Sequence, residues 1–322
     1  MTTDSQATLP VGHTSLLAPR LALGTGPLGN LYQVIPEKQA VETIQAAFNS
    51  GVHFFDTAPL YGAGLSERYL GTALRGIPRD QYVLSTKVGR LEQPDGSIRF
   101  DKLDFTRDGV RRSFEVSLER LKIERIDILH MHDPDDHYRD VLDFAFPALA
   151  ELRSQGVIRA IGAGMNQWQM LAEFARHADF DCFLLAGRYT LLEQGGLELF
   201  SLCQAKKISI FLGGVYNSGI LATGARPGAK YNYVDAPPEI LERVRRIEAV
   251  CARHGVSLRS AALQFPRAHP AVHALLVGAQ SATEFNETLQ ALRAPIPPKL
   301  WTELRAEGLL AESVPVPDHK EL

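Results

Sequence analysis

The stretch HFFDTAPLYGAGLSERYLG (53–71) predicts one strand, one loop and the start of one helix. Its apolar beginning suits a buried strand that ends on Asp56, and Tyr61 follows five residues later. Two glycines then interrupt regular structure before a helix that we expect to begin near Ser66. A buried strand that leads through a loop into a helix is the repeating unit of a parallel sheet covered by helices.

The rest of the chain repeats this unit without repeating its sequence. Helical stretches, such as the one with Val110, Phe114 and Leu118 after a predicted N-cap at Thr106, separate short apolar runs. The predicted strands are 20–26, 53–58, 82–88, 126–132, 158–164, 181–187, 208–214 and 274–280. Eight such units predict an α/β fold of the (β/α)8 TIM barrel type.

No linker rich in Pro, Gly or Ser divides the 322 residues, so we predict that 1–322 form a single domain. The segment 9–23 is expected to form a small hairpin that plugs the bottom of the barrel. A Pro-Asp-Gly turn in 88–104 favours a short hairpin over the barrel mouth, and 213–239 is Gly-rich and long enough to be functional. The tail 312–322 is expected to be disordered or to form a loop lid.

Charge and composition argue against several classes of function. The net charge of -3, the pI near 6.4 and the scattered Lys and Arg argue against nucleic-acid binding. Cys182, Cys203 and Cys251 form an odd set without a C-x-x-C spacing, which argues against a disulfide framework or a zinc site and favours a reducing compartment. We find no signal-peptide pattern and no apolar run near the about 20 residues that a membrane span needs. We therefore expect a cytoplasmic protein.

The segment GTGPLG (24–29) raises an alternative, because it satisfies the G-x-G-x-x-G pattern and Asp56 ends the next strand where a ribose-binding acid would stand. In a dinucleotide-binding fold the helix must begin within the glycines, so that its N-terminus meets the pyrophosphate. Here the first helix is expected to begin after Pro36, and Pro27 removes one amide donor from the loop. The barrel is therefore the preferred interpretation, with the glycines bringing the backbone close to a ligand.

On a TIM barrel the chemistry lies at the carboxyl ends of the strands, and there the sequence places Asp56, Tyr61, Lys87 and His132. Taken singly, each has a structural explanation as a cap, rim packing, a surface lysine or a core histidine. Together they suggest one site, because Lys87 at the end of an apolar strand needs an anion that Asp56 can supply. Lys87 would lower the pKa of the Tyr61 phenol from about 10, and His132 could orient the reacting oxygen.

The pair His130 and His132 also suggests a metal site, since metal-dependent barrel hydrolases use an H-x-H pair. Such enzymes need further ligands at later strand ends. The fifth, sixth and eighth strands end on GAGMN, AGRY and GAQ, which contain no His or Asp. We therefore predict no metal.

Three segments carry a resemblance to a known family. FFDTAPLYG (54–62), STKVG (85–89) and IDILHMHDP (126–134) are similar to the signature regions of the aldo-keto reductases, and the similarity runs from 21–29 to 278–289. The resemblance implies a (β/α)8 barrel that moves a hydride between a nicotinamide cofactor and a carbonyl or alcohol.

By this resemblance Asp56, Tyr61, Lys87 and His132 occupy the four catalytic positions of the family, with Tyr61 as proton donor or acceptor. His132 fits better than His130, because it directly precedes an Asp-Pro pair where the family has an aromatic residue and a proline. His130 is expected to point the same way, one layer deeper in the barrel.

The chain departs from the family pattern around the nicotinamide. It has Gly164-Met165-Asn166 where many members have Ser-Asn, Ala186 where a glutamine is usual, and Gly213 where an aromatic residue often stacks on the ring. We expect Asn166 to bind the carboxamide and Tyr216 to supply the stacking.

The adenosine end favours NAD. Relatives that use NADPH place a basic residue near 278 and an arginine near 284, whereas this chain has Gly278 and Glu284. A carboxylate repels a 2'-phosphate but accepts a hydrogen bond from a free 2'-hydroxyl, so we predict NAD over NADP. The expected cofactor contacts are Thr25, Gly26, Asp56, Asn166, Gly213, Tyr216, Gly278, Gln280, Glu284, Glu287 and Thr288.

The resemblance is greatest to a branch of aldose 1-dehydrogenases, among them L-fucose and L-galactose dehydrogenases, together with a pyridoxal 4-dehydrogenase. It implies oxidation of a small cyclic hemiacetal to a lactone, on a free aldose such as L-fucose, L-galactose or D-arabinose. The alternatives are pyridoxal oxidation, general aldehyde reduction, and a non-catalytic nicotinamide-binding regulatory protein, which would need no proton relay. Besides Tyr61 and His132, the residues expected to contact substrate are Arg90, His137 and Trp168. The oligomeric state is not predicted.

Overall fold

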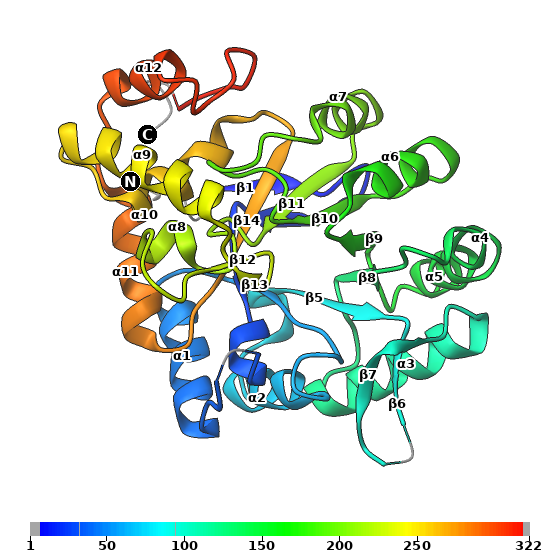
Figure 1. The fold of residues 1–322 in the computed structure, drawn as a ribbon. Coiled ribbons are helices and arrows are strands. Elements are labelled where there is room, and N and C mark those ends of the chain that lie inside the picture. The colour runs from blue at the N-terminus through cyan, green and yellow to red at the C-terminus, as the bar shows by residue number, and fades with distance from the viewer. Residues whose placement is uncertain (1–6, 32, 94, 318–322) are drawn as a thin grey trace.

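The protein is described by a computed structural model that covers residues 7–31, 33–93 and 95–317. Eight parallel strands close into a barrel in the order β10-β11-β14-β3-β4-β5-β8-β9 (Figure 1). The strands are β3 (Leu21–Gly24), β4 (Phe54–Asp56), β5 (Val83–Val88), β8 (Ile128–His132), β9 (Ala160–Met165), β10 (Cys182–Ala186), β11 (Ser209–Gly213) and β14 (Val272–Gly278). Each lies within or overlaps one of the predicted strands, so the (β/α)8 barrel is confirmed.

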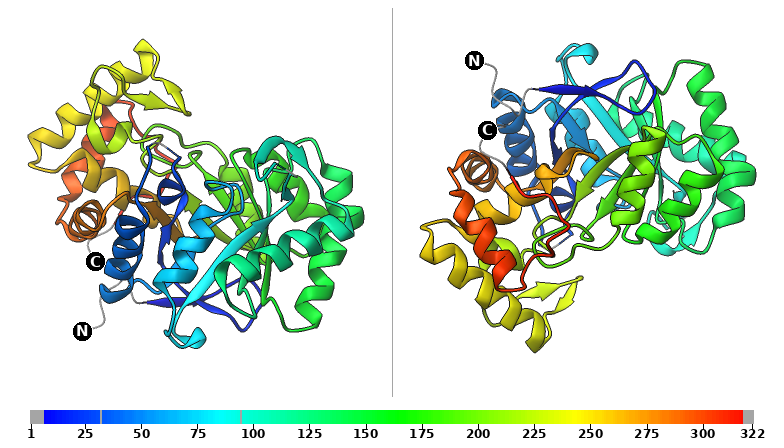
Figure 2. Two further views of the ribbon diagram at one scale, coloured as in Figure 1. Left: turned by 90° about the horizontal axis from the view of Figure 1, so that it is seen from below. Right: turned by 90° about the horizontal axis from the view of Figure 1, so that it is seen from above.

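Helices cover the outside of this barrel (Figures 1 and 2). They are α1 (Glu37–Asn49), α2 (Leu65–Ala73), α3 (Arg107–Leu121), α4 (Tyr138–Asp140), α5 (Phe146–Ser154), α6 (Trp168–His177), α7 (Leu197–Lys206), α8 (Ile220–Thr223), α9 (Pro238–Arg253), α10 (Leu258–Gln264), α11 (Ala282–Arg293) and α12 (Pro298–Ala306). Thr106 caps α3 as predicted, because its side chain accepts a hydrogen bond from the Gly109 amide. Helix α2 begins one residue before Ser66, since Gly64 takes the cap position in a left-handed conformation (φ 80°).

The glycine-rich segment after β3 forms a short 3-10 helix (Gly26–Gly29). The first α-helix starts only at Glu37, directly after Pro36, as predicted. No α-helix begins within the described part of this loop and the sheet is a closed barrel, so the alternative of a Rossmann-type dinucleotide-binding fold is wrong.

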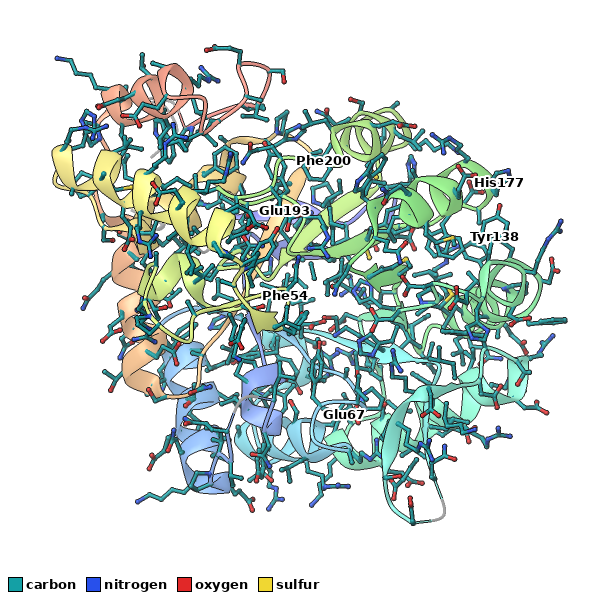
Figure 3. The ribbon with its side chains drawn as sticks, viewed as in Figure 1. Phe54, Glu67, Tyr138, His177, Glu193 and Phe200 are labelled. Carbon is teal, nitrogen blue, oxygen red and sulfur yellow. The ribbon has the colours of Figure 1, made fainter. Side chains whose placement is uncertain are left out.

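A hairpin of β1 (Thr8–Pro10) and β2 (Leu17–Pro19) closes the bottom of the barrel, as predicted. Its Val11 and Leu16 are buried in one apolar cluster with Phe54, which lies inside the barrel (Figure 3). Gly12 packs the turn against the beginnings of β11 and β10. Its amide donates to Ser209 Oγ at 2.9 Å, and a Cβ at Gly12 would lie 2.4 Å from the carbonyl oxygen of Asp181, the residue before β10.

The opposite end of the barrel carries longer connections. Segment 88–104 forms the predicted hairpin, with β6 (Arg90–Glu92) and β7 (Ile98–Leu103), although Pro94 of its expected turn lies outside the described residues. The long loop after β11 contains α8 and a second hairpin, β12 (Lys230–Tyr231) and β13 (Val234–Asp235). Figure 2 shows this second hairpin at the end of the barrel opposite β1 and β2.

The tail packs against α12 as far as it is described. Val314 is buried, and its carbonyl oxygen accepts a hydrogen bond from Arg305 Nη2 at 2.6 Å. The prediction of disorder or a lid for 312–322 stays a prediction, and 318–322 lie outside the described residues.

Side chains of β8 fill the part of the barrel interior that lies between β8 and β9. His130 lies beside Gly162 in the register, and His132 lies beside Gly164. A Cβ added at Gly162 would lie 2.2 Å from His130 Nδ1. Glycine on one strand therefore makes the room that the histidines of its neighbour occupy.

Candidate active site

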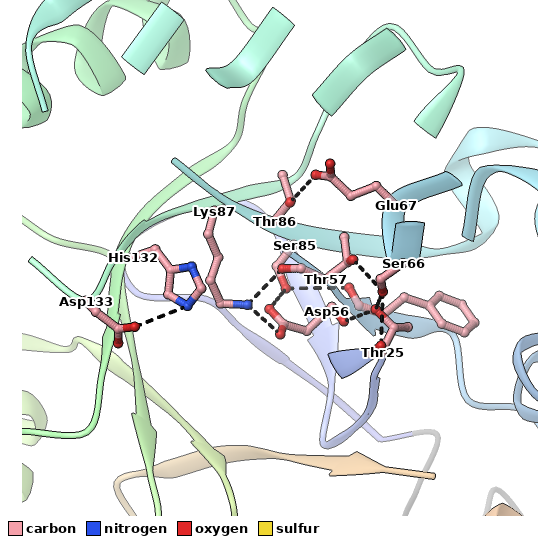
Figure 4. Close-up of polar contacts among 11 residues, drawn as sticks. Thr25, Asp56, Thr57, Ser66, Glu67, Ser85, Thr86, Lys87, His132 and Asp133 are labelled. Carbon is pink, nitrogen blue, oxygen red and sulfur yellow. Dashed lines mark hydrogen bonds and ion pairs between the residues drawn. The ribbon is translucent and has the colours of Figure 1, made fainter. Parts of the chain in front are cut away.

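An ion pair between Lys87 and Asp56 forms the floor of the barrel mouth (Figure 4). Lys87 Nζ donates to Asp56 Oδ2 and to the Thr57 carbonyl oxygen, each at 2.8 Å. Ser85 Oγ donates to the other carboxylate oxygen of Asp56 at 2.7 Å. Lys87 and Asp56 are only 2% and 3% exposed, so both charges depend on these partners.

The strand register explains why these groups meet. Asp56, the last residue of β4, pairs with Ser85 on β5, and Lys87 stands two residues further on the same face. Behind them, Ser66 Oγ lies 2.6 Å from Thr25 Oγ1 and 3.1 Å from Thr57 Oγ1, which joins the loops after β3 and β4 to α2.

The loop after β4 presents Tyr61 to this ion pair. Lys87 Nζ lies 4.7 Å from the centroid of the Tyr61 ring. The Tyr61 and His132 rings meet edge to face, with centroids 6.0 Å apart. Close packing places the loop, since a Cβ added at Gly29 would come within 2.6 Å of the Tyr61 carbonyl carbon. The structure thus brings together all four residues predicted to act at the mouth.

Burial changes the expected titration of Tyr61. Burial raises the pKa of its phenol above the ordinary 10.0, Lys87 lowers that pKa, and Asp56 raises it again. The prediction that Lys87 would bring the pKa of Tyr61 below its ordinary value is therefore wrong for this structure, because desolvation is the larger effect. Burial also acts on Lys87 and lowers its pKa, but Asp56 and Tyr61 outweigh it and keep this pKa raised. Lys87 is consequently a permanent ammonium.

His132 is held neutral. Burial lowers its pKa well below 6.5, and the nearby charges of Lys87 and Arg90 lower that pKa further. Its Nε2 lies 3.5 Å from Asp133 Oδ2 (Figure 4), and within the described chain its Nδ1 has no hydrogen-bond partner. His130 lies deeper and fully buried, where burial lowers its pKa to about 3.

A second buried network supports the loop that carries Tyr61. Glu67, on α2 (Figure 3), is fully buried and accepts hydrogen bonds from Thr86 Oγ1 at 2.8 Å and Arg120 Nη1 at 3.1 Å. Arg120 also donates to Glu92 on β6 at 2.5 Å. This network ties α2, β5 and the β6–β7 hairpin together beside the mouth.

Of the three additional substrate residues predicted, Arg90 lies beside His132. It is 4% exposed and donates to Asp133 Oδ2 at 3.1 Å. His137 is engaged elsewhere, with its Nδ1 2.8 Å from Asp140 Oδ2. Trp168 packs on the turn before α7, where a Cβ added at Gly196 would lie 3.2 Å from its ring.

Three glycines near the barrel mouth have room for a side chain. Gly24, Gly164 and Gly213 stand at or near the carboxyl ends of their strands, and a Cβ added at any of them would meet protein atoms no closer than 3.5 Å. Packing within the protein therefore does not require glycine at these positions. A nicotinamide ring bound next to these glycines would occupy that room and would account for the missing side chains.

Helix α11 contains most of the residues expected at the adenosine end. Glu284 caps its N-terminus, because Glu284 Oε2 accepts from the Gln280 amide at 2.8 Å while the Glu284 amide donates to Ser281 Oγ. Glu287 pairs with Arg259 of α10 at 2.7 Å, and Thr288 Oγ1 donates to the Glu284 carbonyl oxygen. Glu284 is thus a helix cap whose carboxylate also remains partly exposed.

The remaining expected cofactor residues have varied surroundings. Gly278 packs on the ring of Pro27, where a Cβ would come within 2.7 Å, and Gly26 lies against the Tyr61 ring. Thr25 is fully buried and donates to the Asp56 carbonyl oxygen. Tyr216 points to the side of α10 and α11, since Arg259, Thr288 and Glu284 all influence its pKa, which burial raises to about 12. A hydrogen bond with the Thr288 side chain partly offsets this effect of burial.

Two residues of the site were missed, and one of them had a signal in the sequence. Ser85 precedes Lys87 by two residues on one strand, so period-two alternation places both on the same face. Asp133 follows His132 directly but resembles an ordinary turn residue before a proline. Its left-handed backbone (φ 45°) turns its carboxylate back toward the mouth, which sequence reasoning did not foresee.

Within the described ranges, no group of three or more His, Cys, Asp or Glu residues is placed to hold a metal ion. No described helix is both long and apolar enough to cross a membrane.

A parallel eight-stranded barrel with a tyrosine, a buried lysine–aspartate pair and a neutral histidine at its mouth can transfer a proton at a substrate oxygen, and the match to a known family makes it a nicotinamide-dependent oxidoreductase acting on CH–OH groups. Residues 20–307 match the model of the Aldo/keto reductase family, and the chain belongs to this family.

Sequence similarity to proteins of known activity extends over nearly the whole chain. It is 38% identical to the D-threo-aldose 1-dehydrogenase of a Pseudomonas species, over 92% of this chain and 95% of that relative. It is 37% identical to the pyridoxal 4-dehydrogenase of Microbacterium luteolum, over 94% of this chain and 97% of that relative. The fold matches the holo form of an aldo-keto reductase from Bacillus halodurans with a TM-score of 0.78, at 25% identity over 98% of this chain and 99% of that one.

Proposed function

We propose that this protein is an NAD-dependent dehydrogenase that oxidises the C1 hemiacetal of a free aldose, of the L-fucose, L-galactose or D-arabinose type, to the lactone. The observation that carries the proposal is the Lys87 ammonium, held by Asp56 within 4.7 Å of the Tyr61 ring centroid and next to a neutral His132. The similarity to an aldose 1-dehydrogenase over nearly the whole chain supports the choice of substrate.

In the proposed reaction Tyr61, as the phenolate, removes the proton of the anomeric hydroxyl. Lys87 stabilises the phenolate charge, and Asp56 holds Lys87 in position. Neutral His132 donates a hydrogen bond to the anomeric oxygen and orients it. A bound nicotinamide supplies the acceptor for the hydride that leaves C1. Loss of this proton and this hydride converts the hemiacetal to the lactone.

Substitution of Tyr61 tests the proton transfer. We expect Tyr61→Phe to lower kcat by about 100-fold or more, because general acid–base groups contribute about 10²- to 10⁴-fold. Cofactor binding, followed by quenching of tryptophan fluorescence, is expected to stay near the wild-type value. A Tyr61→Phe protein that turned over at the wild-type rate would favour the non-catalytic, regulatory alternative.

The proposed preference for NAD rests on Glu284, a partly exposed carboxylate at the N-terminus of α11. Its negative charge repels a 2'-phosphate, whereas a free ribose hydroxyl can donate to it. Glu284→Gln keeps an oxygen that can cap Gln280 and removes only the charge, so we expect kcat/KM with NADP+ to rise relative to NAD+. A wild-type kcat/KM that is higher with NADP+ would overturn the preference.

Pyridoxal is the second candidate substrate, because the similarity to a pyridoxal 4-dehydrogenase is equally extensive. Its internal hemiacetal presents the same reacting group to Tyr61 and His132. The distinguishing assay follows NADH absorbance with L-fucose, L-galactose, D-arabinose and pyridoxal, each with NAD+ and with NADP+. We expect the largest kcat/KM for an aldose with NAD+, and a larger value for pyridoxal would replace the proposed substrate. Turnover confined to aldehyde reduction would point to a general aldehyde reductase.

A further inference from the structure

Asp133 places a carboxylate next to the position proposed for the reacting oxygen. Its Oδ2 lies 3.5 Å from His132 Nε2, which is longer than a good hydrogen bond, and accepts from Arg90 Nη2 at 3.1 Å. The Asp133 amide donates to the Gly164 carbonyl oxygen at 2.9 Å, so the backbone is anchored to β9. The side chain is 32% exposed and can reach a ligand in the mouth.

The backbone conformation at this position does not by itself call for aspartate. Asp133 has a left-handed backbone (φ 45°), a conformation that glycine and asparagine adopt at least as readily. Burial raises the pKa of Asp133, while the Arg90 guanidinium lowers it. Arg90 thus balances the charge of this carboxylate, and the exposed part of the Asp133 side chain stays accessible to a ligand beside His132.

The turn of the β12–β13 hairpin brings Tyr233 into the neighbourhood of Asp133. Asn232 and Tyr233 both have positive φ, at 50° and 68°, as in a tight hairpin turn. Arg188 Nη1 donates to Asn232 Oδ1 at 2.8 Å, and the Tyr233 amide donates to Ser218 Oγ at 2.9 Å. In Figure 1 this hairpin lies near the centre of the barrel end that faces the viewer.

Tyr233 combines an exposed ring with a shielded hydroxyl. The residue is 58% exposed, yet burial raises the pKa of its hydroxyl. The Asp133 carboxylate raises that pKa further, whereas a hydrogen bond with the Asn166 side chain lowers it. The Tyr233 hydroxyl therefore lies near Asp133 and Asn166, while more than half of the residue is exposed.

We propose that Asp133 is a specificity-determining residue that accepts a hydrogen bond from the substrate hydroxyl on the carbon next to the reacting one. His132 Nε2 and Asp133 Oδ2 are separated by a distance comparable to that between oxygens on neighbouring carbons. One atom can then bind the C1 oxygen while the other binds the C2 hydroxyl. This inference rests on the proposed function, and it selects aldoses over pyridoxal, which has no hydroxyl on the carbon that neighbours its reacting carbon.

The test compares D-arabinose with 2-deoxy-D-ribose, which is D-arabinose without its C2 hydroxyl. For the wild-type protein with NAD+ we expect kcat/KM to be about 10- to 100-fold higher for D-arabinose, the range for a hydrogen bond to a charged group. Asp133→Gly removes the carboxylate and keeps the left-handed backbone, so this ratio is expected to fall close to one. Asp133→Asn retains an acceptor oxygen and is expected to give an intermediate ratio.

Two further variants separate recognition from general damage. Asp136→Asn removes an exposed carboxylate from the same loop and is expected to leave the ratio unchanged. Tyr233→Ala removes a neighbour of Asp133 and keeps the carboxylate, so it is also expected to leave the ratio unchanged. An unchanged ratio in both Asp133→Gly and Asp133→Asn would overturn this inference alone. A wild-type protein that oxidised neither sugar with either cofactor would overturn the proposed function, and this inference with it.

Discussion

Replacing Lys87 with methionine would leave the buried Asp56 carboxylate without its cation. The two charged atoms are 2.8 Å apart, which corresponds to a direct attraction of about 6 kcal/mol at an effective dielectric constant of about 20. Much of this attraction offsets the cost of burying the two groups. Removing one partner of a buried pair nevertheless leaves an uncompensated charge, so we expect Lys87→Met to lower the free energy of unfolding by about 3–5 kcal/mol.

Urea unfolding of four proteins measures this loss: the wild type, Lys87→Met, Asp56→Asn and the double variant. The double variant removes both charges, and it is expected to regain most of the stability that Lys87→Met loses. A double variant as unstable as Lys87→Met would refute the reasoning, because the loss would then come from packing of the lysine stem. A change below about 1 kcal/mol in Lys87→Met would refute it as well.

Activity provides a second readout that stability cannot imitate. Lys87 is the group that lowers the pKa of Tyr61 against the effect of burial. We therefore expect the double variant to stay inactive in aldose oxidation at neutral pH even where its stability recovers. Recovery of kcat together with stability would show that Lys87 acts only as a structural partner of Asp56.

Three other predictions follow from buried groups. Because burial raises the pKa of Tyr61, kcat for oxidation is expected to increase from about pH 7 to about pH 10, and a flat profile would contradict a phenolate base. His130 has a pKa of about 3 in place of 6.5, so unfolding takes up a proton below pH 6.5. The free energy of unfolding is therefore expected to fall by about 3 kcal/mol between pH 6.5 and pH 4. Urea unfolding of His130→Asn should show a shallower dependence on pH. Arg120→Met leaves the fully buried Glu67 without a cation and is expected to cost about 3–5 kcal/mol in thermal or urea unfolding, most of which Glu67→Gln should restore in the same chain.

The barrel could be predicted because buried parallel strands need apolar residues along their length, and 82–88 and 126–132 have them. Lys87 and His132 stand out at the ends of those runs, since a charged or polar residue there needs a partner or a function. Asp133 carries no such signal, because a turn after a strand normally contains polar residues.

Two features depended on tertiary structure. The β12–β13 hairpin pairs only Lys230–Tyr231 with Val234–Asp235, which is too short to leave an alternating pattern in the sequence. The direction of the Tyr61 pKa shift depends on how burial and the charge of Lys87 balance. The sequence identified Lys87 as a neighbour of Tyr61, but it could not show how deeply Tyr61 is buried.

The packing of His130 on β8 against Gly162 on β9 has a consequence for the evolution of this protein. His130 occupies the volume that a side chain at 162 would need, because even a Cβ there would come within 2.2 Å of its ring. The two positions are therefore expected to covary among homologues, with any residue larger than glycine at 162 accompanied by one smaller than histidine at 130. An engineered variant with a larger residue at 162 therefore needs a smaller residue at 130.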